Sequence, residues 1–215
     1  MNRTLYIYDH CPFCVKAEMI FGLKDVPVTF EILLNDDEEG PKRMVGKKLV
    51  PILEEDGRFM GESMDIVAHI DAIGSPVLTA PENPQIAAWL ERCGKISNRL
   101  FLPRAAAAPL PEFATTRARA YFIRNKEKWA GAFFDLFEQG PDLIREVDAL
   151  LVELAPMIQS PEAVNGTLST DDLHLFAQLR SLTIVAGLTF PGPVDAYVRR
   201  MAERAKIDLL DQVAA

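Results

Sequence analysis

The sequence predicts a small α/β domain followed by an all-helical domain, and three observations lead to this prediction. Strand and helix patterns alternate over the first third of the chain and end in a hairpin pattern whose tip is Asp56-Gly57. The stretch 74–84 (GSPVLTAPENP) then contains three prolines and further helix breakers, as linkers do. Beyond it the apolar residues recur almost entirely at helical spacing. We therefore expect domains at 1–74 and 84–215, joined by a linker at 75–83.

The first domain combines short β-branched or aromatic runs with short amphipathic segments. Its elements, in the order β-α-β-α-β-β-α, are expected at 4–8, 14–23, 28–34, 42–45, 50–53, 58–60 and 62–73. The run at 28–34 (VTFEILL) is nearly all apolar, which is typical of a strand buried on both faces. This pattern favours a sheet with a crossover helix.

The second domain is expected to contain only helices, at 84–107, 115–138, 141–157, 170–187 and 193–212. Ser169 and Asp172 fit a capping box at the start of the fourth of these helices, which indicates a structural role. Cys93 is expected to be a buried small hydrophobe. Five aromatic residues of this half are expected in the core or between the domains, namely Trp89, Trp129, Phe133, Phe134 and Phe137.

Composition and charge exclude several classes of protein. The 215 residues are 49% hydrophobic and 25% charged, as in an ordinary globular protein, and three cysteines are too few for a disulfide scaffold. Lys and Arg number 23 against 31 Asp and Glu, and a net charge of −8 argues against nucleic-acid binding. The N-terminal residues do not resemble a secretory signal, and no apolar run is long enough for a membrane span. We expect a cytoplasmic protein in a reducing compartment.

Two of the three cysteines lie three positions apart, in Cys11-Pro12-Phe13-Cys14, where a strand leads into a helix. One helical turn brings their sulfur atoms within bonding reach. We expect Cys11 at the exposed N-cap, where it suits nucleophilic attack, and Cys14 inside the first turn, where it suits resolution of a mixed disulfide. In a reducing compartment such a pair favours redox chemistry.

A reactive Cys11 needs a thiol pKa well below about 8.5. The helix dipole alone lowers a pKa by about one unit, so hydrogen bonds to the sulfur are needed as well. Pro12 has no N–H, and the nearest donors are therefore the amides of Phe13 and Cys14. His10 and Lys16 are candidates for additional positive charge.

The pair has two other interpretations. A structural zinc site needs four ligands, but no second close cysteine pair exists, so we expect no metal. The remaining candidate ligands are scattered, and they are His10, His69, Cys93 and His174. A pair of unreactive core cysteines is the remaining alternative. The strand-turn-helix context favours redox function over both.

Three further positions lie in patterns with more than one interpretation. An X–Pro bond such as Val50-Pro51 is cis in only about 5–6% of cases, so local sequence favours trans. Glu62-Ser63 begins a helix, where a hydroxyl and free amides bind an anion or simply cap the helix. Lys47 and Lys48 are placed to attract a carboxylate, although most lysine pairs are only solvated.

Taken together, these segments resemble the glutaredoxin 2 family over essentially the whole chain. The resemblance is carried by residues 6–14, 33–37, 44–46, 50–53 and 62–67, and by 163–166 and 169–176 in the second half. It implies an α/β thioredoxin-like N-terminal domain plus an all-α C-terminal domain, the glutathione-transferase architecture. It also implies a monomer.

The same resemblance implies residue roles. Cys11 would be the nucleophile and Cys14 the resolving cysteine, and the Val50-Pro51 bond would be cis. The Val50 backbone would pair with the cysteinyl unit of glutathione, and Glu62 and Ser63 would hold its γ-glutamyl end. The implied glutathione site consists of Cys11, Phe13, Val50, Pro51, Glu62 and Ser63. Phe13 stands where many glutaredoxins have Tyr, which removes a hydroxyl group but leaves the redox chemistry unaffected in principle.

The sequence thus predicts a glutathione-dependent thiol–disulfide oxidoreductase. Glutathione is the expected cosubstrate, and disulfide-bonded or glutathionylated proteins are the expected partners. An omega-type glutathione transferase or dehydroascorbate reductase is the alternative, because the same architecture serves those enzymes, but a single cysteine suffices there and Cys14 argues against it. A non-catalytic binding module is a third hypothesis, and the presence of both cysteines argues against that as well.

Overall fold

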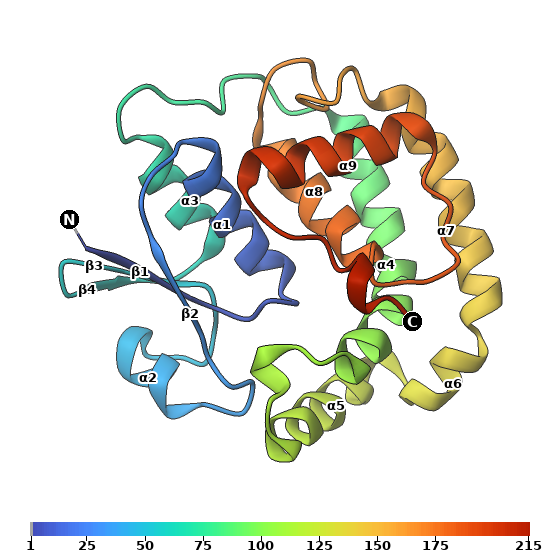
Figure 1. Ribbon diagram of the computed structural model, residues 1–215, viewed down its shortest axis with the longest axis horizontal. Helices are drawn as coiled ribbons and strands as arrows, with labels where there is room; N and C mark the ends of the chain where they lie inside the picture. Colours follow the sequence, from blue (N-terminus) through green and yellow to red (C-terminus); the bar gives the residue numbers. More distant parts are fainter. Residues whose placement is uncertain (1) are drawn as a thin grey trace.

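The computed structural model describes residues 2–215 and consists of a sheet unit and a helical unit that lie side by side (Figure 1). The sheet has four strands in the order β2-β1-β3-β4, and β1 pairs in parallel with β2 and antiparallel with β3. Its strands are β1 (Arg3–Ile7), β2 (Thr29–Ile32), β3 (Ile52–Glu55) and β4 (Arg58–Met60). The β3–β4 hairpin turns at Asp56 and Gly57, as predicted.

Three helices accompany the sheet: α1 (Pro12–Leu23), α2 (Glu39–Val45) and α3 (Ser63–Asp71). Helices α1 and α3 pack against each other on one face of the sheet, with α2 on the other side (Figure 1). Apolar side chains of α1 and α3 bury the inner sheet face and form its core with Leu5 and Leu53. The predicted β-α-β-α-β-β-α order is confirmed.

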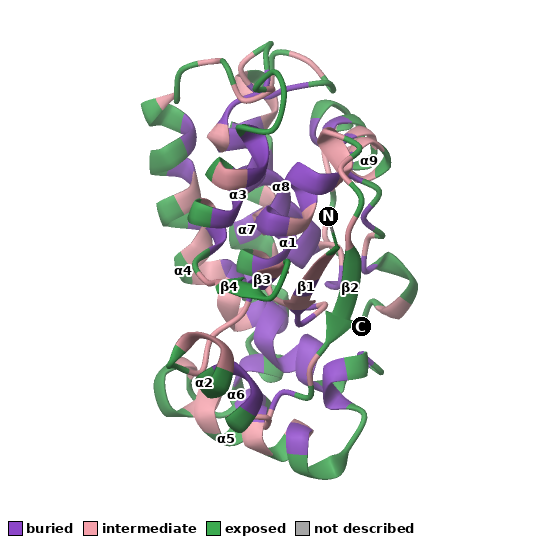
Figure 2. Ribbon diagram, turned by 90° about the vertical axis from the view of Figure 1, so that its left-hand side faces the viewer, coloured by how far each residue is buried: buried purple, intermediate pink, exposed green. Residues whose placement is uncertain are grey.

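Strand β2 contradicts the expectation of a strand buried on both faces. All four of its residues are exposed, and Phe30 and Ile32 are among the exposed large hydrophobic side chains (Figure 2). The reason is its position at the sheet edge, where it has β1 on one side and no strand on the other. An apolar run therefore did not distinguish an edge strand from a central one.

The helical unit contains α4 (Pro84–Ala107), α5 (Thr116–Ala130), α6 (Phe133–Glu138), α7 (Gly140–Leu154), α8 (Thr170–Leu182) and α9 (Gly192–Ala205). Short 3₁₀ turns η1 (Pro111–Phe113), η2 (Ala155–Met157) and η3 (Asp211–Val213) connect or follow them. None of the helices within residues 2–215 combines the length and the apolar character that crossing a membrane requires. Between Asp71 and Pro84 the described backbone forms neither helix nor strand. The domain limits at 1–74, 75–83 and 84–215 stay a prediction.

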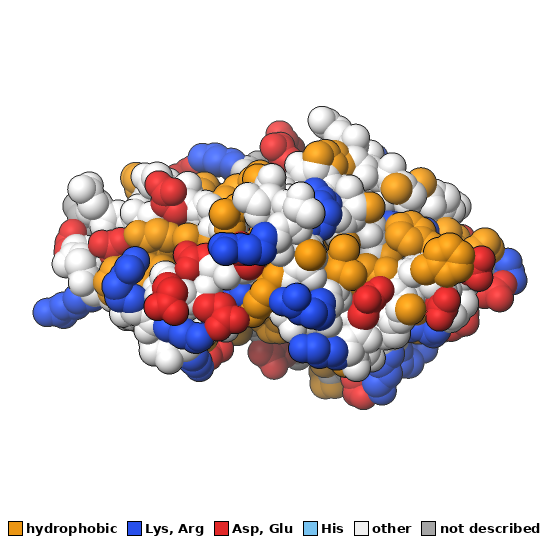
Figure 3. Space-filling model, turned by 90° about the horizontal axis from the view of Figure 1, so that it is seen from below, with side chains coloured by type: hydrophobic (Ala, Val, Ile, Leu, Met, Phe, Trp, Pro, Cys, Tyr) orange, Lys and Arg blue, Asp and Glu red, His pale blue; other side chains and the backbone are white. Residues whose placement is uncertain are grey.

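The predicted helix at 84–107 has the observed bounds, but the one at 115–138 is wrong as a single helix. It divides at Gly131, which ends α5 with φ of +95°, a conformation that glycine adopts without strain. The predicted packing of its aromatic residues also fails in part. Trp129 and Phe134 are 60% and 72% exposed, whereas Phe133 is buried. Figure 3 shows hydrophobic side chains gathered on the side of the molecule where α6 lies.

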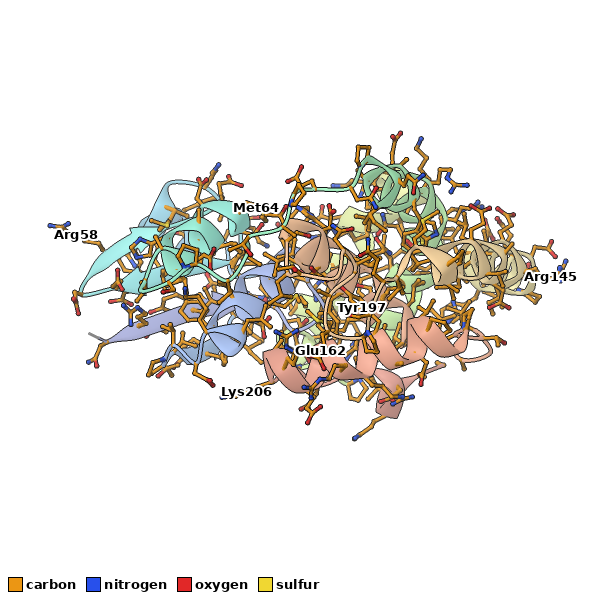
Figure 4. All side chains as sticks on the ribbon, turned by 90° about the horizontal axis from the view of Figure 1, so that it is seen from above. Arg58, Met64, Arg145, Glu162, Tyr197 and Lys206 are labelled. Atoms are coloured by element: carbon orange, nitrogen blue, oxygen red, sulfur yellow. The ribbon has the colours of Figure 1, made fainter. Side chains whose placement is uncertain are left out.

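Other expectations for the helical unit are confirmed. Trp89 is fully buried and its Nε1 donates to the Leu150 carbonyl at 2.7 Å. Cys93 is also fully buried. The Ser169–Asp172 capping box is present, and the buried Tyr197 hydroxyl donates to Asp172 Oδ1 at 2.9 Å. In Figure 4, Tyr197 points into the interior of this unit.

The two units meet along α1, which packs on α8 and α9 as well as on α3. The approach is closest at Gly22, where a Cβ atom would lie 1.9 Å from the Ala205 carbonyl oxygen. Only glycine permits this contact. Helix α1 is therefore held between the sheet and the helical unit, and its N-terminal end lies where the two units join (Figure 1).

Candidate active site

The cysteine pair lies at the start of α1, directly after β1 and the short loop of Tyr8 to His10. Cys11 is the N-cap residue with extended backbone (φ −79°, ψ 116°), and it is half-buried. Cys14 has no exposed surface, and its Sγ accepts a hydrogen bond from the Tyr8 amide at 3.4 Å. Both thiols are free. Cys11 is therefore the more accessible of the two cysteines, as expected, but it is half-buried rather than exposed.

The surroundings move the two thiol pKa values in opposite directions. A hydrogen bond from the Cys14 thiol lowers the pKa of Cys11 most, and the His10 charge and the amides of Cys14 and Phe13 lower it further. These contributions outweigh burial, which acts the other way, and the pKa of Cys11 falls to about 6. Burial, together with the neighbouring Cys11, raises the pKa of Cys14 well above its ordinary value. At neutral pH, therefore, Cys11 is mostly thiolate and Cys14 is a thiol.

One turn beyond Cys14, Glu18 faces the junction with the helical unit. Burial raises the pKa of its carboxyl group to about 7, although the Arg180 charge opposes this rise. The nearby Asp9 and Cys11 charges add to the effect of burial. Lys16, on the same helix, is buried, with its Nζ 4.4 Å from the centre of the Phe13 ring.

A cavity of about 290 Å³ opens beside the Cys11 sulfur, between the two units. The sheet unit contributes Tyr8, Cys11 and Val50 to its walls, and α5 contributes Tyr121 and Lys126. The Val50-Pro51 peptide bond is cis. This confirms the expectation from the resemblance and shows that the preference for trans from local sequence was wrong here. A larger hollow at Asp36, Glu38 and Arg117 has no cysteine in its walls.

The remaining predicted glutathione residues lie outside the walls of this cavity. Glu62 precedes α3 with φ of +64°, and its exposed carboxylate pairs with Lys47 at 2.7 Å. Ser63, the first residue of α3, is buried, and the next residue, Met64, marks this helix start in Figure 4. Phe13 is 57% exposed and Pro51 is buried. The structure thus brings Cys11, Cys14 and Val50 together and places Glu62 and Ser63 at a second helix start.

Two charged residues of the helical unit contact the cysteine loop, and the sequence analysis missed both. Arg180 on α8 donates to the Asp9 carbonyl at 2.7 Å and to Asp9 Oδ1 at 2.6 Å. Glu112 on η1 accepts from the His10 amide at 2.9 Å and contacts His10 Nδ1. They lie 171 and 102 positions from their partners, so spacing gave no indication of the contacts. The available signal was that Glu112 and Arg180 are each a single charged residue within an apolar segment.

Within residues 2–215, no group of three or more His, Cys, Asp and Glu side chains is arranged to hold a metal ion. The described site supports thiol chemistry, because one thiolate and one shielded thiol lie a helical turn apart.

Comparison with known proteins identifies the family. The model for the C-terminal domain of glutaredoxin 2 matches residues 85–214, and the chain is 50% identical to glutaredoxin 2 of Escherichia coli K12 over 98% of its own length and 99% of that protein. The chain belongs to the glutaredoxin 2 family. Membership makes the protein a glutathione-dependent oxidoreductase.

The structural comparisons agree with this membership. Glutaredoxin 2 of Salmonella typhimurium, solved in complex with glutathione, superposes with a TM-score of 0.98 at 49% identity over the full length of both chains. The model for the glutathione S-transferase N-terminal domain matches residues 5–77. A glutathione S-transferase of Ceriporiopsis subvermispora shares the fold, with a TM-score of 0.71 at 14% identity over 97% of this chain and 98% of that one. The predicted glutathione-transferase architecture is therefore confirmed.

Proposed function

We propose that this protein reduces protein disulfides and glutathione mixed disulfides through a Cys11/Cys14 dithiol, with glutathione as cosubstrate. The observation that carries the proposal is the arrangement of the two cysteines at the start of α1, where Cys11 is the half-buried N-cap residue and Cys14 is fully buried. These surroundings lower the pKa of Cys11 to about 6 and raise that of Cys14. Family membership supports glutathione-dependent redox chemistry in general. The monomeric state and cytoplasmic location expected from the sequence belong to the same proposal.

The first step is attack of the Cys11 thiolate on one sulfur of a substrate disulfide. A bond forms between Cys11 and that sulfur, the substrate bond breaks, and the other sulfur leaves as a thiolate that takes a proton from water. The half-buried position of Cys11 beside the cavity supports this role, because an incoming sulfur has access to it.

The second step differs between the two kinds of substrate. In a protein mixed disulfide, Cys14 loses its proton and attacks Cys11, which releases the reduced protein thiol and leaves a Cys11–Cys14 disulfide. The Cys11 charge and hydrogen bond raise the pKa of Cys14 in the free enzyme, and both are lost once Cys11 is in the mixed disulfide. Two glutathione molecules then reduce the pair and become oxidised glutathione. In a glutathione mixed disulfide, a second glutathione attacks directly.

Glutathione would be bound by local donors, because the first 74 residues hold 8 Lys and Arg against 14 Asp and Glu. Within the described chain no side chain caps the start of α3, so its first amides are free for the γ-glutamyl carboxylate. Ser63 and Glu62 lie at that helix start. The Val50 backbone, next to the cis bond, and the Pro51 and Phe13 side chains complete the proposed site around Cys11.

The test compares Cys11→Ser and Cys14→Ser on a disulfide-bonded protein and on a glutathionylated thiol. We expect Cys11→Ser to lose at least about a thousandfold in turnover on both, and Cys14→Ser to lose activity mainly on the protein disulfide. Cys93→Ala is the matched control, because Cys93 is fully buried and burial raises its pKa to about 12.

Turnover by Cys11→Ser at the wild-type rate would contradict the proposal. If Cys14→Ser loses activity on neither substrate, the omega-type alternative replaces the dithiol mechanism. The pH dependence of Cys11 alkylation in the wild-type protein provides an independent check, with an expected midpoint at pH about 6.

A further inference from the structure

Glu112 is a buried carboxylate at the junction of the two units. It lies on η1, between α4 and α5, and has no exposed surface. Its Oε1 accepts from the His10 amide at 2.9 Å and contacts His10 Nδ1, whereas Oε2 has no hydrogen-bond partner in the described chain. Burial alone would raise the pKa of Glu112, but the hydrogen bond and charge of His10 outweigh burial and hold it below the ordinary value. The pair is therefore a buried carboxylate that contacts both the backbone amide and the side chain of His10.

Aromatic rings hold the His10 side chain in place. It is 6% exposed, with the Phe113 ring stacked at 5.1 Å and the Phe122 ring edge-on at 5.0 Å, and the Tyr8 ring stacks at 5.8 Å. Phe113 is the residue after Glu112, so one short turn supplies both a ring and the charge partner. In such surroundings water screens charges poorly, so a charge on the His10 ring acts strongly on nearby groups.

The residue after His10 is Cys11, and the His10 charge is one of the causes that lower the pKa of this thiol. Glu112 carries the opposite charge and contacts the same His10 side chain. Several other titratable or charged groups surround the His10 ring and the thiol, namely Tyr8, Asp9, Cys14, Lys16, Glu18, Lys48, Tyr121, Lys126 and Arg180.

We propose that Glu112 is a positioning residue for the redox reaction: it holds His10 as an imidazolium beside the Cys11 sulfur, so that the helical unit controls the reactivity of a thiol on the sheet unit. The inference rests on the proposed role of Cys11. It assigns a function in the reaction to a residue outside the sheet unit.

The test is Glu112→Gln, which keeps the shape and the accepting oxygen but removes the charge. The Cys11 thiolate is followed by its ultraviolet absorbance and by its alkylation rate against pH. We expect the midpoint to rise by about one pH unit, so that alkylation at pH 6 slows about fivefold while the rate at pH 8.5 hardly changes. Glu153→Gln is the matched control, because this exposed carboxylate pairs with Arg92 on the surface and should leave the midpoint unchanged.

A second pair of variants separates this role from a structural one. His10→Asn retains a hydrogen-bond donor for Glu112 but carries no charge, and it should raise the midpoint as Glu112→Gln does. Glu112→Asp keeps the negative charge, and its midpoint should stay close to that of the wild type. Adding Glu112→Gln to His10→Asn should cause no further rise. The proposal is overturned if Glu112→Gln leaves the midpoint unchanged, or if it raises the midpoint equally in the His10→Asn background. If Glu112→Gln does not fold, an unchanged midpoint in His10→Asn overturns it as well. A wild-type midpoint near that of an ordinary thiol would instead contradict the proposed function.

Discussion

The starts of α1 and α8 differ in what the backbone N–H groups of the first helical turn interact with. At the start of α8, the Ser169 and Asp172 side chains form a capping box, and Asp172 also accepts from the Val164 amide at 2.7 Å and from the Tyr197 hydroxyl. At the start of α1, no side-chain hydrogen bond forms a cap within residues 2–215. There the amides of Phe13 and Cys14 act on the Cys11 sulfur instead.

The difference separates a structural helix start from a reactive one. Capping satisfies amides that would otherwise lack a partner, and it stabilises a helix by about 1 kcal/mol. At the start of α1 the amides interact with the Cys11 thiolate instead, which lowers the pKa of this thiol. At low pH the thiol is neutral, and part of the stability that a cap would provide is lost. The two helix starts therefore predict opposite effects of substitution on stability and on reactivity.

The largest effect on stability is expected at α8. Asp172→Ala removes the acceptor of two backbone amides and of the Tyr197 hydroxyl in a fully buried site, and should lower the free energy of unfolding by about 3–5 kcal/mol. Denaturant unfolding measures this. Asp195→Ala is the control, because Asp195 also lies in a first helical turn but pairs with Arg199 on the surface, and it should cost less than about 0.5 kcal/mol. Equal losses in the two variants would show that the α8 cap adds no special stability.

A smaller effect, which changes sign with pH, is expected at α1. The folded pKa of Cys11 is about 6 against an ordinary value of 9.0, so the thiolate contributes stability above pH 9 that is lost as pH falls through 6. Cys11→Ser should therefore be less stable than the reduced wild type by about 2 kcal/mol at pH 8. At pH 5, where the wild-type thiol is neutral, the serine cap should make the variant more stable by about 0.5–1 kcal/mol. Urea unfolding under reducing conditions at both pH values measures the difference, and a difference independent of pH would contradict the assigned thiolate.

The smallest effect is expected between the two cysteines. Phe13 is 57% exposed, so the added hydroxyl of Phe13→Tyr should reach solvent. Stability should change by less than about 0.5 kcal/mol, and the pH midpoint of Cys11 alkylation should stay the same. A lower midpoint in this variant would show that the tyrosine hydroxyl donates to the Cys11 sulfur. The side chain at position 13, and not only the backbone amides, would then affect the reactivity at the start of α1.

Features that depend on residues close together in the chain were predicted better than features that depend on distant contacts. The cysteine pair, the Ser169–Asp172 box and the bounds of α4 depend on residues close in the chain, and all three were found from spacing or helix signals. The failures concern burial, since the apolar run of β2 lies at a sheet edge and Trp129 lies on the surface. Amino-acid type alone does not reveal which neighbours cover a side chain.

At the candidate active site, too, the sequence revealed local features but not distant contacts. Cys11 and Cys14 were recognised from three-residue spacing, and the cis bond before Pro51 followed from the family resemblance alone. Glu112 and Arg180 were missed because their partners lie far along the chain and the contacts exist only after the two units pack together.

The contacts at Asp9 and His10 have a consequence for protein engineering. Two successive residues of the cysteine loop are held by two separate parts of the helical unit, Asp9 by Arg180 on α8 and His10 by Glu112 on η1. A thioredoxin-like unit cut out at the linker would keep both cysteines but lose both anchors. The proposed redox centre therefore depends on the helical unit, and grafting it onto another scaffold would require both distant anchors to be grafted with it.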